Sequence, residues 1–218
     1  MKELRRNRAR IRTAGLLVCA VLFGCGQETV VLPSSETGGA CGAWYPSGGA
    51  DAGDVYGYEE GKTLPCDVFE SARLDGTDLY LSMGALYLDA VHGLSDARSV
   101  VFVVSAASCP SCAVFVQELA ADADGLEASG AVLIDVTFCD NTDRTDCDFD
   151  LDRAVETAAA EGWPVDRWSV TNDAEGHLKQ LFRDTFPTVI VARLSDMQVL
   201  SVDRVPDAER LTTLLESL

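Results

Sequence analysis

Three segments of the chain are predominantly apolar and rich in β-branched residues, namely 99–105, 131–138 and 188–194. Runs of this length without a polar face are typical of strands that are buried on both sides of a sheet. The intervals between them have other patterns, which are helical or form short strands. The pattern therefore predicts an α/β domain built on a central sheet.

Helical periodicity and turn signals define the remaining predicted elements. A hairpin is predicted over 64–81, where Asp75-Gly76 supplies the turn. The other elements are helices over 109–123, 151–161, 174–182 and 207–218, and short strands over 168–171 and 197–202. Because strands and helices alternate along most of the chain, we expect a mixed sheet with helices on both faces and the hairpin as an N-terminal extension.

The beginning of the chain has the composition of a secretory signal peptide. Six Lys or Arg residues lie within the first twelve positions, and an apolar run follows at 14–23. That run is too short to cross a bilayer, which needs about 20 apolar residues. The leader ends in Leu22-Phe23-Gly24-Cys25, which resembles the lipobox of bacterial lipoproteins. This resemblance implies a signal peptide over 1–24, cleavage before Cys25 and a lipid on the Cys25 sulfur.

Glycine is frequent in the segment that follows the leader, with nine of the 36 residues from 26 to 61. A segment of this kind buries little apolar surface and is typical of a linker. We therefore predict a lipidated, flexible tether over 25–54 and one folded domain over 55–218. The protein is expected in the cell envelope, anchored by lipid in a membrane and facing the periplasm.

The net charge excludes one class of partner. It is −18 for the whole chain, and loss of the leader, with its six basic residues and one acid, takes it to −23. A surface so acidic repels phosphate backbones, so we expect no nucleic-acid partner. Eight cysteines are too many for a chain kept in a reducing cytosol and indicate an oxidising compartment.

A Cys-x-x-Cys motif, Cys109-Pro110-Ser111-Cys112, stands between a predicted buried strand and a predicted helix. The unpaired N–H groups at a helix N-terminus favour a thiolate there. The two-residue spacing brings both sulfurs onto one helical turn, so we expect Cys109 to be the attacking thiol and Cys112 the resolving one. No charged residue lies between Arg98 and Glu118, so the helix end and the backbone must supply most of any lowering of the Cys109 pKa, unless a residue distant in sequence folds onto it.

The motif and its surroundings resemble the thioredoxin superfamily. A buried strand, the Cys-x-x-Cys motif, a helix and a later Phe186-Pro187-Thr188 before an apolar strand follow one another as in that superfamily. Within it, the chain is similar to the TlpA-type redoxins of bacterial envelopes. The segments that carry this likeness are Tyr45-Pro46-Ser47-Gly48, Gly61-Lys62-Thr63-Leu64-Pro65, Leu74-Asp75-Gly76 and 168–173. The resemblance covers roughly 55–218 and implies a thioredoxin-like fold.

The same resemblance implies an enzyme, a thiol–disulfide oxidoreductase that needs no cofactor. Its implied partners are thiols and disulfides of extracytoplasmic proteins, and a membrane or soluble thiol that donates electrons. It also implies a cis-proline at Pro187, which shapes the groove where a partner's cysteine docks.

Departures from related families leave the direction of the reaction open. Ser108 stands where thioredoxin has Trp, and the intervening pair Pro110-Ser111 differs from the Gly-Pro of thioredoxin. The sequence therefore leaves open whether the protein reduces or oxidises its substrates. Ala106 stands three residues before Cys109, where peroxiredoxins have Thr or Ser, and this disfavours peroxidase chemistry.

Four further cysteines remain in the mature chain, and four cysteines allow three pairings. The simplest pairs are the nearest in sequence, Cys41–Cys66 and Cys139–Cys147. We expect both to be structural disulfides, with a second redox pair at Cys139 and Cys147 as the alternative.

A non-catalytic binding protein is the contrasting class of function. In it the Cys-x-x-Cys motif would be a structural disulfide or a copper-binding clip, for which only His92 and His177 could supply imidazole. Both histidines are more simply surface residues, so we expect no metal site.

The lipid anchor can be tested by detergent phase separation. Expressed in a bacterium, the wild-type protein should enter the detergent phase, because lipid chains on Cys25 partition with apolar solvent. The Cys25→Ala variant should stay in the aqueous phase. Equal partitioning of the two proteins would contradict the predicted anchor.

Overall fold

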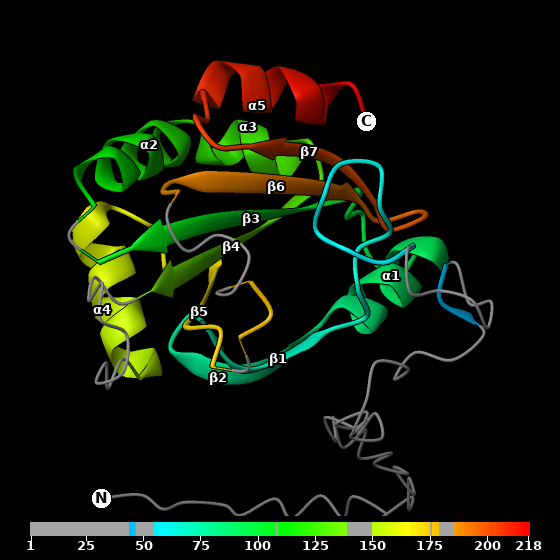
Figure 1. Cartoon of the computed structure of the whole chain (residues 1–218), viewed down its shortest axis with the longest axis horizontal. Helices are drawn as coiled ribbons and strands as arrows, with labels where there is room; N and C mark the ends of the chain where they lie inside the picture. Colours follow the sequence, from blue (N-terminus) through cyan, green and yellow to red (C-terminus); the bar gives the residue numbers. More distant parts are fainter. Residues whose placement is uncertain (1–43, 47–54, 108, 139–149, 175, 179–184) are drawn as a thin grey trace, which may run out of the picture. The chain divides into compact units, whose positions relative to one another are not determined.

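The computed structural model describes residues 44–46, 55–107, 109–138, 150–174, 176–178 and 185–218, all of which belong to one compact unit, Pro33–Leu218. Seven strands form a single sheet in the order β2-β1-β5-β4-β3-β6-β7 (Figure 1). The strands are β1 (Val68–Leu74), β2 (Thr77–Ser82), β3 (Ser99–Ala106), β4 (Ala131–Phe138), β5 (Ser169–Thr171), β6 (Thr188–Arg193) and β7 (Gln198–Asp203). β3, β4 and β5 run parallel, and every other neighbouring pair is antiparallel. The predicted mixed sheet is confirmed.

Helices cover both faces of this sheet. They are α1 (Met83–Val91), α2 (Pro110–Ala121), α3 (Ala123–Ala128), α4 (Leu151–Glu161) and α5 (Ala208–Glu216). α1 packs on one face, and the other four helices contribute buried side chains to the opposite face. Within the described residues, no helix combines the length and the apolar character that crossing a bilayer requires.

The hairpin around Asp75-Gly76 is confirmed, as β1 and β2 pair on either side of it. Both turn residues have positive φ, 48° and 70°, which an Asp-Gly pair accommodates. The predicted strand 99–105 is β3, with one more residue, and the predicted strand 131–138 is β4.

The sequence pattern did not predict two of the helices, α1 and α3. α1 begins directly after β2, where the Ser82 hydroxyl accepts a hydrogen bond from the Ala85 N–H and caps the first turn. The predicted helix 109–123 is α2, which ends before Asp122 because that residue leaves the helical conformation, and α3, which was not predicted, begins after it.

The predicted helix 174–182 is wrong over its described residues, which form turns. Asp173 has a φ of 47°, and its carboxylate accepts hydrogen bonds from the N–H groups of His177 and Leu178. Gly176 has a φ of 81°, which a helix does not contain. The side chain of Asp173 therefore satisfies the backbone that a helix would have satisfied.

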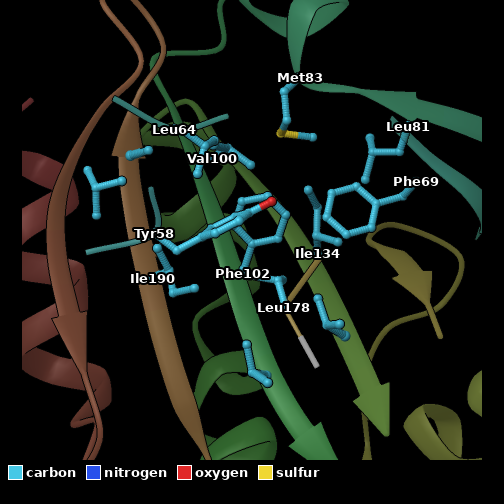
Figure 2. Close-up of a cluster of buried hydrophobic side chains, with 14 of the residues drawn as sticks. Tyr58, Leu64, Phe69, Leu81, Met83, Val100, Phe102, Ile134, Leu178 and Ile190 are labelled. Atoms are coloured by element: carbon cyan, nitrogen blue, oxygen red, sulfur yellow. The ribbon is translucent and has the colours of Figure 1, made fainter. Parts of the chain in front are cut away.

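The core consists of two layers, one on each face of the sheet. Figure 2 shows part of the first layer, where Phe102 of β3 lies among side chains from other strands and from the N-terminal segment. The ring centroids of Phe102 and Phe69 are 5.7 Å apart. The second layer contains Val101 and Val103 of the same strand, with Phe115 from α2. β3 is thus buried on both faces, as its sequence predicts.

The N-terminal segment packs on the first layer. Tyr45 is only 2% exposed, and its hydroxyl donates a hydrogen bond to the Leu64 carbonyl at 2.9 Å. Its ring meets that of Tyr87 in α1 edge to face, at 5.5 Å between centroids. Further along, the Leu64 N–H donates to the Met197 carbonyl, beside the outer strand β7. Tyr45 falls inside the range predicted as a tether, yet it belongs to the core.

Removal of the Tyr45 ring should destabilise the domain. Tyr45→Phe loses one buried hydrogen bond and should lower the free energy of unfolding by about 1 kcal/mol. Tyr45→Ala also loses the ring packing and should lower it by about 3–5 kcal/mol. Urea denaturation of both variants measures these losses.

Tyr80→Ala is the matched control, because this tyrosine is 69% exposed. It should change the free energy of unfolding by no more than about 0.5 kcal/mol. If Tyr45→Ala behaved like Tyr80→Ala, the packing of Tyr45 would contribute nothing.

Candidate functional site

The Cys-x-x-Cys motif follows the end of β3. The N–H of Ala107 donates to the Phe138 carbonyl at 2.8 Å, which ties the connecting loop to the end of β4. The N–H of Cys109 then donates to the Ala106 carbonyl at 3.1 Å. Pro110 opens α2, a position where its missing N–H costs no hydrogen bond. Strand pairing and helix start together fix the position of Cys109.

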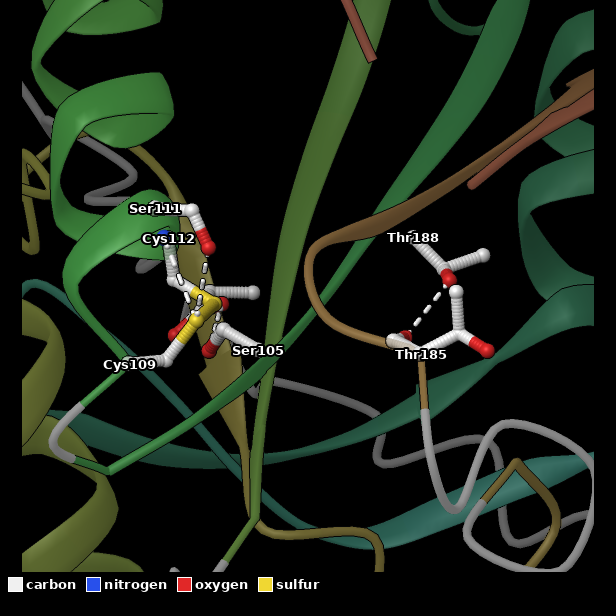
Figure 3. Close-up of a disulfide and its surroundings, with 7 residues drawn as sticks. Ser105, Cys109, Ser111, Cys112, Thr185 and Thr188 are labelled. Atoms are coloured by element: carbon white, nitrogen blue, oxygen red, sulfur yellow. Dashed lines mark hydrogen bonds between the residues drawn. A yellow bond between two sulfur atoms is a disulfide. The ribbon is translucent and has the colours of Figure 1, made fainter. Parts of the chain in front are cut away.

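Cys109 and Cys112 form a disulfide, with their Cα atoms 5.2 Å apart (Figure 3). Cys109 is partly exposed, whereas Cys112 is fully buried. The Cys112 N–H donates to the Cys109 Sγ at 3.2 Å, and the Ser111 hydroxyl oxygen lies 3.4 Å from the same sulfur. These contacts and the helix N-terminus favour negative charge on Cys109 once the bond is reduced.

Pro187 lies beside the end of β3. The pairing of β3 with β6 places Thr188 opposite Val104, and Pro187 immediately precedes it. The Phe186–Pro187 peptide bond is cis, as the family resemblance implies, and Pro187 is buried. Figure 3 shows Thr185 and Thr188 in the surroundings of the disulfide, and the Thr188 hydroxyl donates to the Thr185 carbonyl at 2.8 Å.

A buried acid lies in the same region, and the sequence reasoning missed it. Asp135 is 1% exposed and occupies the middle of β4, in register with Val103. The Ser105 hydroxyl donates to its Oδ1 at 3.0 Å, and the Thr137 hydroxyl donates to its Oδ2. Burial raises the pKa of Asp135 to about 6, although the two hydroxyl donors oppose this rise. The one signal in the sequence was a single acid within the otherwise uncharged run 131–138.

A second buried acid, at the end of a helix, interacts electrostatically with Asp135. Glu161 is the last residue of α4 and is 9% exposed. Burial first, and the charge of Asp135 second, raise the pKa of Glu161 to about 7. In the described part of the chain, its Oε2 has no hydrogen-bond partner. Two carboxyl groups of raised pKa therefore lie on the face of the sheet that α2 covers.

Of the other cysteines to which the sequence assigns a role, only Cys66 is among the described residues. Cys66 is disulfide-bonded, and its partner lies outside the described residues. Cys25, Cys41, Cys139 and Cys147 also lie outside them. Both pairings and the lipidation therefore stay predictions.

Neither histidine has a described contact with the dithiol. The His177 ring contacts the ring of Phe69, the Val68 carbonyl and, at 3.5 Å, the carboxylate of Asp67. His92 ends α1. Over the described residues, no three His, Cys, Asp or Glu side chains are grouped as metal ligands would be. The copper-clip alternative gains no support from the described residues.

Comparison with known proteins identifies the fold. No protein-family model matches the chain, and no curated protein matches its sequence. The mitochondrial 2-Cys peroxiredoxin of Plasmodium falciparum aligns with a TM-score of 0.52 over 73% of this chain and 93% of its own, at 6% identity. A putative protein disulfide isomerase from Bacteroides thetaiotaomicron aligns with a TM-score of 0.51 over 73% and 87%, at 12% identity. The chain has a thioredoxin-like fold, as its sequence predicts.

The raised pKa of Asp135 predicts a specific pH dependence of stability. The folded protein holds this proton up to pH of about 6, whereas the unfolded chain releases it near 3.8. The free energy of unfolding should therefore fall between these pH values, by about 3 kcal/mol for this group. Asp135→Asn should remove that fall, so its stability relative to wild type should rise with pH.

Urea denaturation of the oxidised proteins at pH 4 and pH 7 measures this difference. Glu118→Gln, which removes an exposed acid from α2, serves as the control and should track the wild type. A stability difference between Asp135→Asn and wild type that stays constant with pH would contradict the assignment.

Proposed function

We propose that the protein is an envelope-anchored thiol–disulfide oxidoreductase, which uses Cys109 and Cys112 to reduce or exchange disulfides in extracytoplasmic proteins. The observation that carries the proposal is the unequal exposure of the two sulfurs at one helix start. Cys109 is accessible and accepts an N–H donor, whereas Cys112 is fully buried behind it. A structural disulfide needs no such asymmetry, but a nucleophile with a resolving thiol does.

The surroundings of Cys109 suit a docked polypeptide. Pro187 precedes β6 at the end of β3, and Phe186 packs edge to face on Phe138 at 6.0 Å between centroids. Val114, five residues after Cys109 in α2, is 58% exposed. These side chains are all uncharged, although the protein as a whole is strongly acidic. These described side chains would suit a neutral segment around the cysteine of a partner.

The reaction proceeds by two exchanges of disulfide bonds. The Cys109 thiolate attacks one sulfur of a substrate disulfide, forms a mixed disulfide and releases the other sulfur as a thiolate. Cys112 then loses its proton and attacks the Cys109 sulfur. This step forms the Cys109–Cys112 disulfide and releases the second substrate sulfur, so that two electrons have passed to the substrate. A thiol donor returns the dithiol to its reduced form, and the reverse steps oxidise a substrate dithiol.

Single-cysteine variants test the proposal. Cys112→Ser keeps the attacking thiol but removes the group that resolves the mixed disulfide, so disulfide-linked partners should accumulate in the envelope and disappear on reduction. Cys109→Ser should accumulate few, because Cys112 is buried. Non-reducing electrophoresis of envelope fractions compares the two.

The double variant Cys109→Ser/Cys112→Ser is the control for partners held by other cysteines. If neither single variant traps more than this control, the oxidoreductase proposal fails. A non-catalytic binding function would then take its place.

A further inference from the structure

Helix α1 presents apolar side chains to solvent, although the protein as a whole is strongly acidic. Asp89 is the one charged residue among its nine, Met83–Val91. Val91, the last of them, is 49% exposed, and Leu94 in the turn that follows is 74% exposed. The Leu94 N–H donates to the Asp89 carbonyl at 2.8 Å, which holds this turn to the end of the helix. The exposure of Leu94 is therefore a defined feature of the fold.

The N-terminal segment adds an aromatic side chain to this surface. Trp44 is 41% exposed, and its ring stacks on that of Tyr87 in α1, with the centroids 6.5 Å apart. Tyr87 and Val91 are four residues apart and are therefore neighbours on one side of the helix. We call Trp44, Tyr87, Val91 and Leu94 the α1 patch. Apolar side chains gathered in this way, rather than scattered singly, mark a contact with a partner or a membrane.

The length of chain before Trp44 indicates what the α1 patch meets. Eighteen residues, 26–43, separate Trp44 from Cys25, the predicted site of lipidation. A flexible coil of this length spans about 25 Å, and even full extension gives only about 60 Å. An anchor on Cys25 would thus hold the α1 patch near the membrane surface and give it a high effective concentration there.

The chemistry of the α1 patch also suits the surface of a bilayer. Tryptophan and tyrosine are enriched where membrane meets water, because each ring is apolar and carries one polar group. Trp44 and Tyr87 provide two such rings, beside the aliphatic side chains of Val91 and Leu94. No Lys or Arg lies between residues 73 and 98. Apolar contact, and not attraction to anionic lipid, would therefore hold the domain.

We propose that the α1 patch docks on the surface of the membrane that holds the lipid anchor. The inference rests on the anchoring that the proposed function includes, and it assigns the orientation of the domain. Leu94 precedes β3 by five residues, and β3 then runs for about 25 Å away from α1 (Figure 1). The dithiol follows at the far end of this strand. Docking therefore presents Cys109 to the solvent, so soluble extracytoplasmic proteins, rather than proteins embedded in the bilayer, are the substrates.

Quenching of tryptophan fluorescence by brominated lipid tests the docking. The full-length lipidated protein is inserted into phosphatidylcholine vesicles with brominated acyl chains, and into vesicles without bromine. The other two tryptophans, Trp163 and Trp168, are each 2% exposed and pack on the face of the sheet opposite α1. Because bromine quenches only at close range, a loss of emission reports Trp44. Trp44→Phe should abolish this loss.

Leu94→Glu should undock the domain, because it places a charge where the α1 patch meets acyl chains. The ratio of docked to undocked protein, measured by the quenched fraction of the emission, should fall by about tenfold. This is the size expected for partial burial of one leucine side chain.

Val205→Glu is the matched control, because it adds the same charge at another exposed apolar residue. Val205 is 85% exposed and lies between β7 and α5, a helix that packs on the face of the sheet opposite α1. The quenched fraction of this variant should equal that of wild type. An equal fall in both variants would show that charge alone, and not the α1 patch, determines the quenching.

Alkylation of the reduced protein tests the orientation. Cys109 should react with a membrane-impermeant maleimide at a rate on vesicles within twofold of that in detergent, because docking leaves the dithiol in solvent. Mass spectrometry of the peptide that contains Cys109 measures this rate. A rate that is more than tenfold lower on vesicles would overturn the assigned orientation.

The outcomes separate the docking from the function on which it rests. Protein that the vesicles do not retain would overturn both the anchor and the docking. Retained protein whose Trp44 emission is not quenched would overturn the docking alone, and this is also the result if a second copy of the chain covers the α1 patch. Failure of Cys112→Ser to trap partners would contradict the oxidoreductase chemistry and would leave the quenching unchanged.

Discussion

The arrangement of the site depends on the burial of β3 at the centre of the sheet. All eight residues of this strand are buried, and its two faces serve the two core layers. A shift of one residue along β4 or β6 would turn the side chains of either pairing to the wrong layer, so the register is strongly specified. This register sets Cys109 at the end of the strand and Pro187 beside it. The geometry of the dithiol is therefore a consequence of core packing.

The same strand and its parallel neighbour also carry polar groups that a core normally excludes. An isolated carboxylate in such a place would be costly, and Asp135 persists because Ser105 and Thr137 donate hydrogen bonds to it. Its raised pKa shows that these donors compensate burial only in part. A buried acid whose burial is only partly compensated is more readily explained by a chemical role than by packing.

The sequence predicted the sheet well because its strands are unusually uniform. β3 and β4 are predominantly apolar, with two polar residues each, and such runs leave few alternatives. The dithiol and Pro187 were found because motif and order along the chain locate them. The turns after Asp173 were not foreseen, since a side chain there bonds the backbone locally and overrides helical periodicity. Asp135 and Glu161 are 26 residues apart in the chain, and only the packing of α4 against the sheet brings them together.

The central claim is that Cys109 and Cys112 form a redox-active pair. Equilibrium titration of the full chain against glutathione buffers, with both cysteines followed by alkylation and mass spectrometry, tests it most directly. The account predicts a reduction potential between about −270 and −120 mV, the range of thiol–disulfide oxidoreductases. A value below about −300 mV, as structural disulfides have, would contradict it.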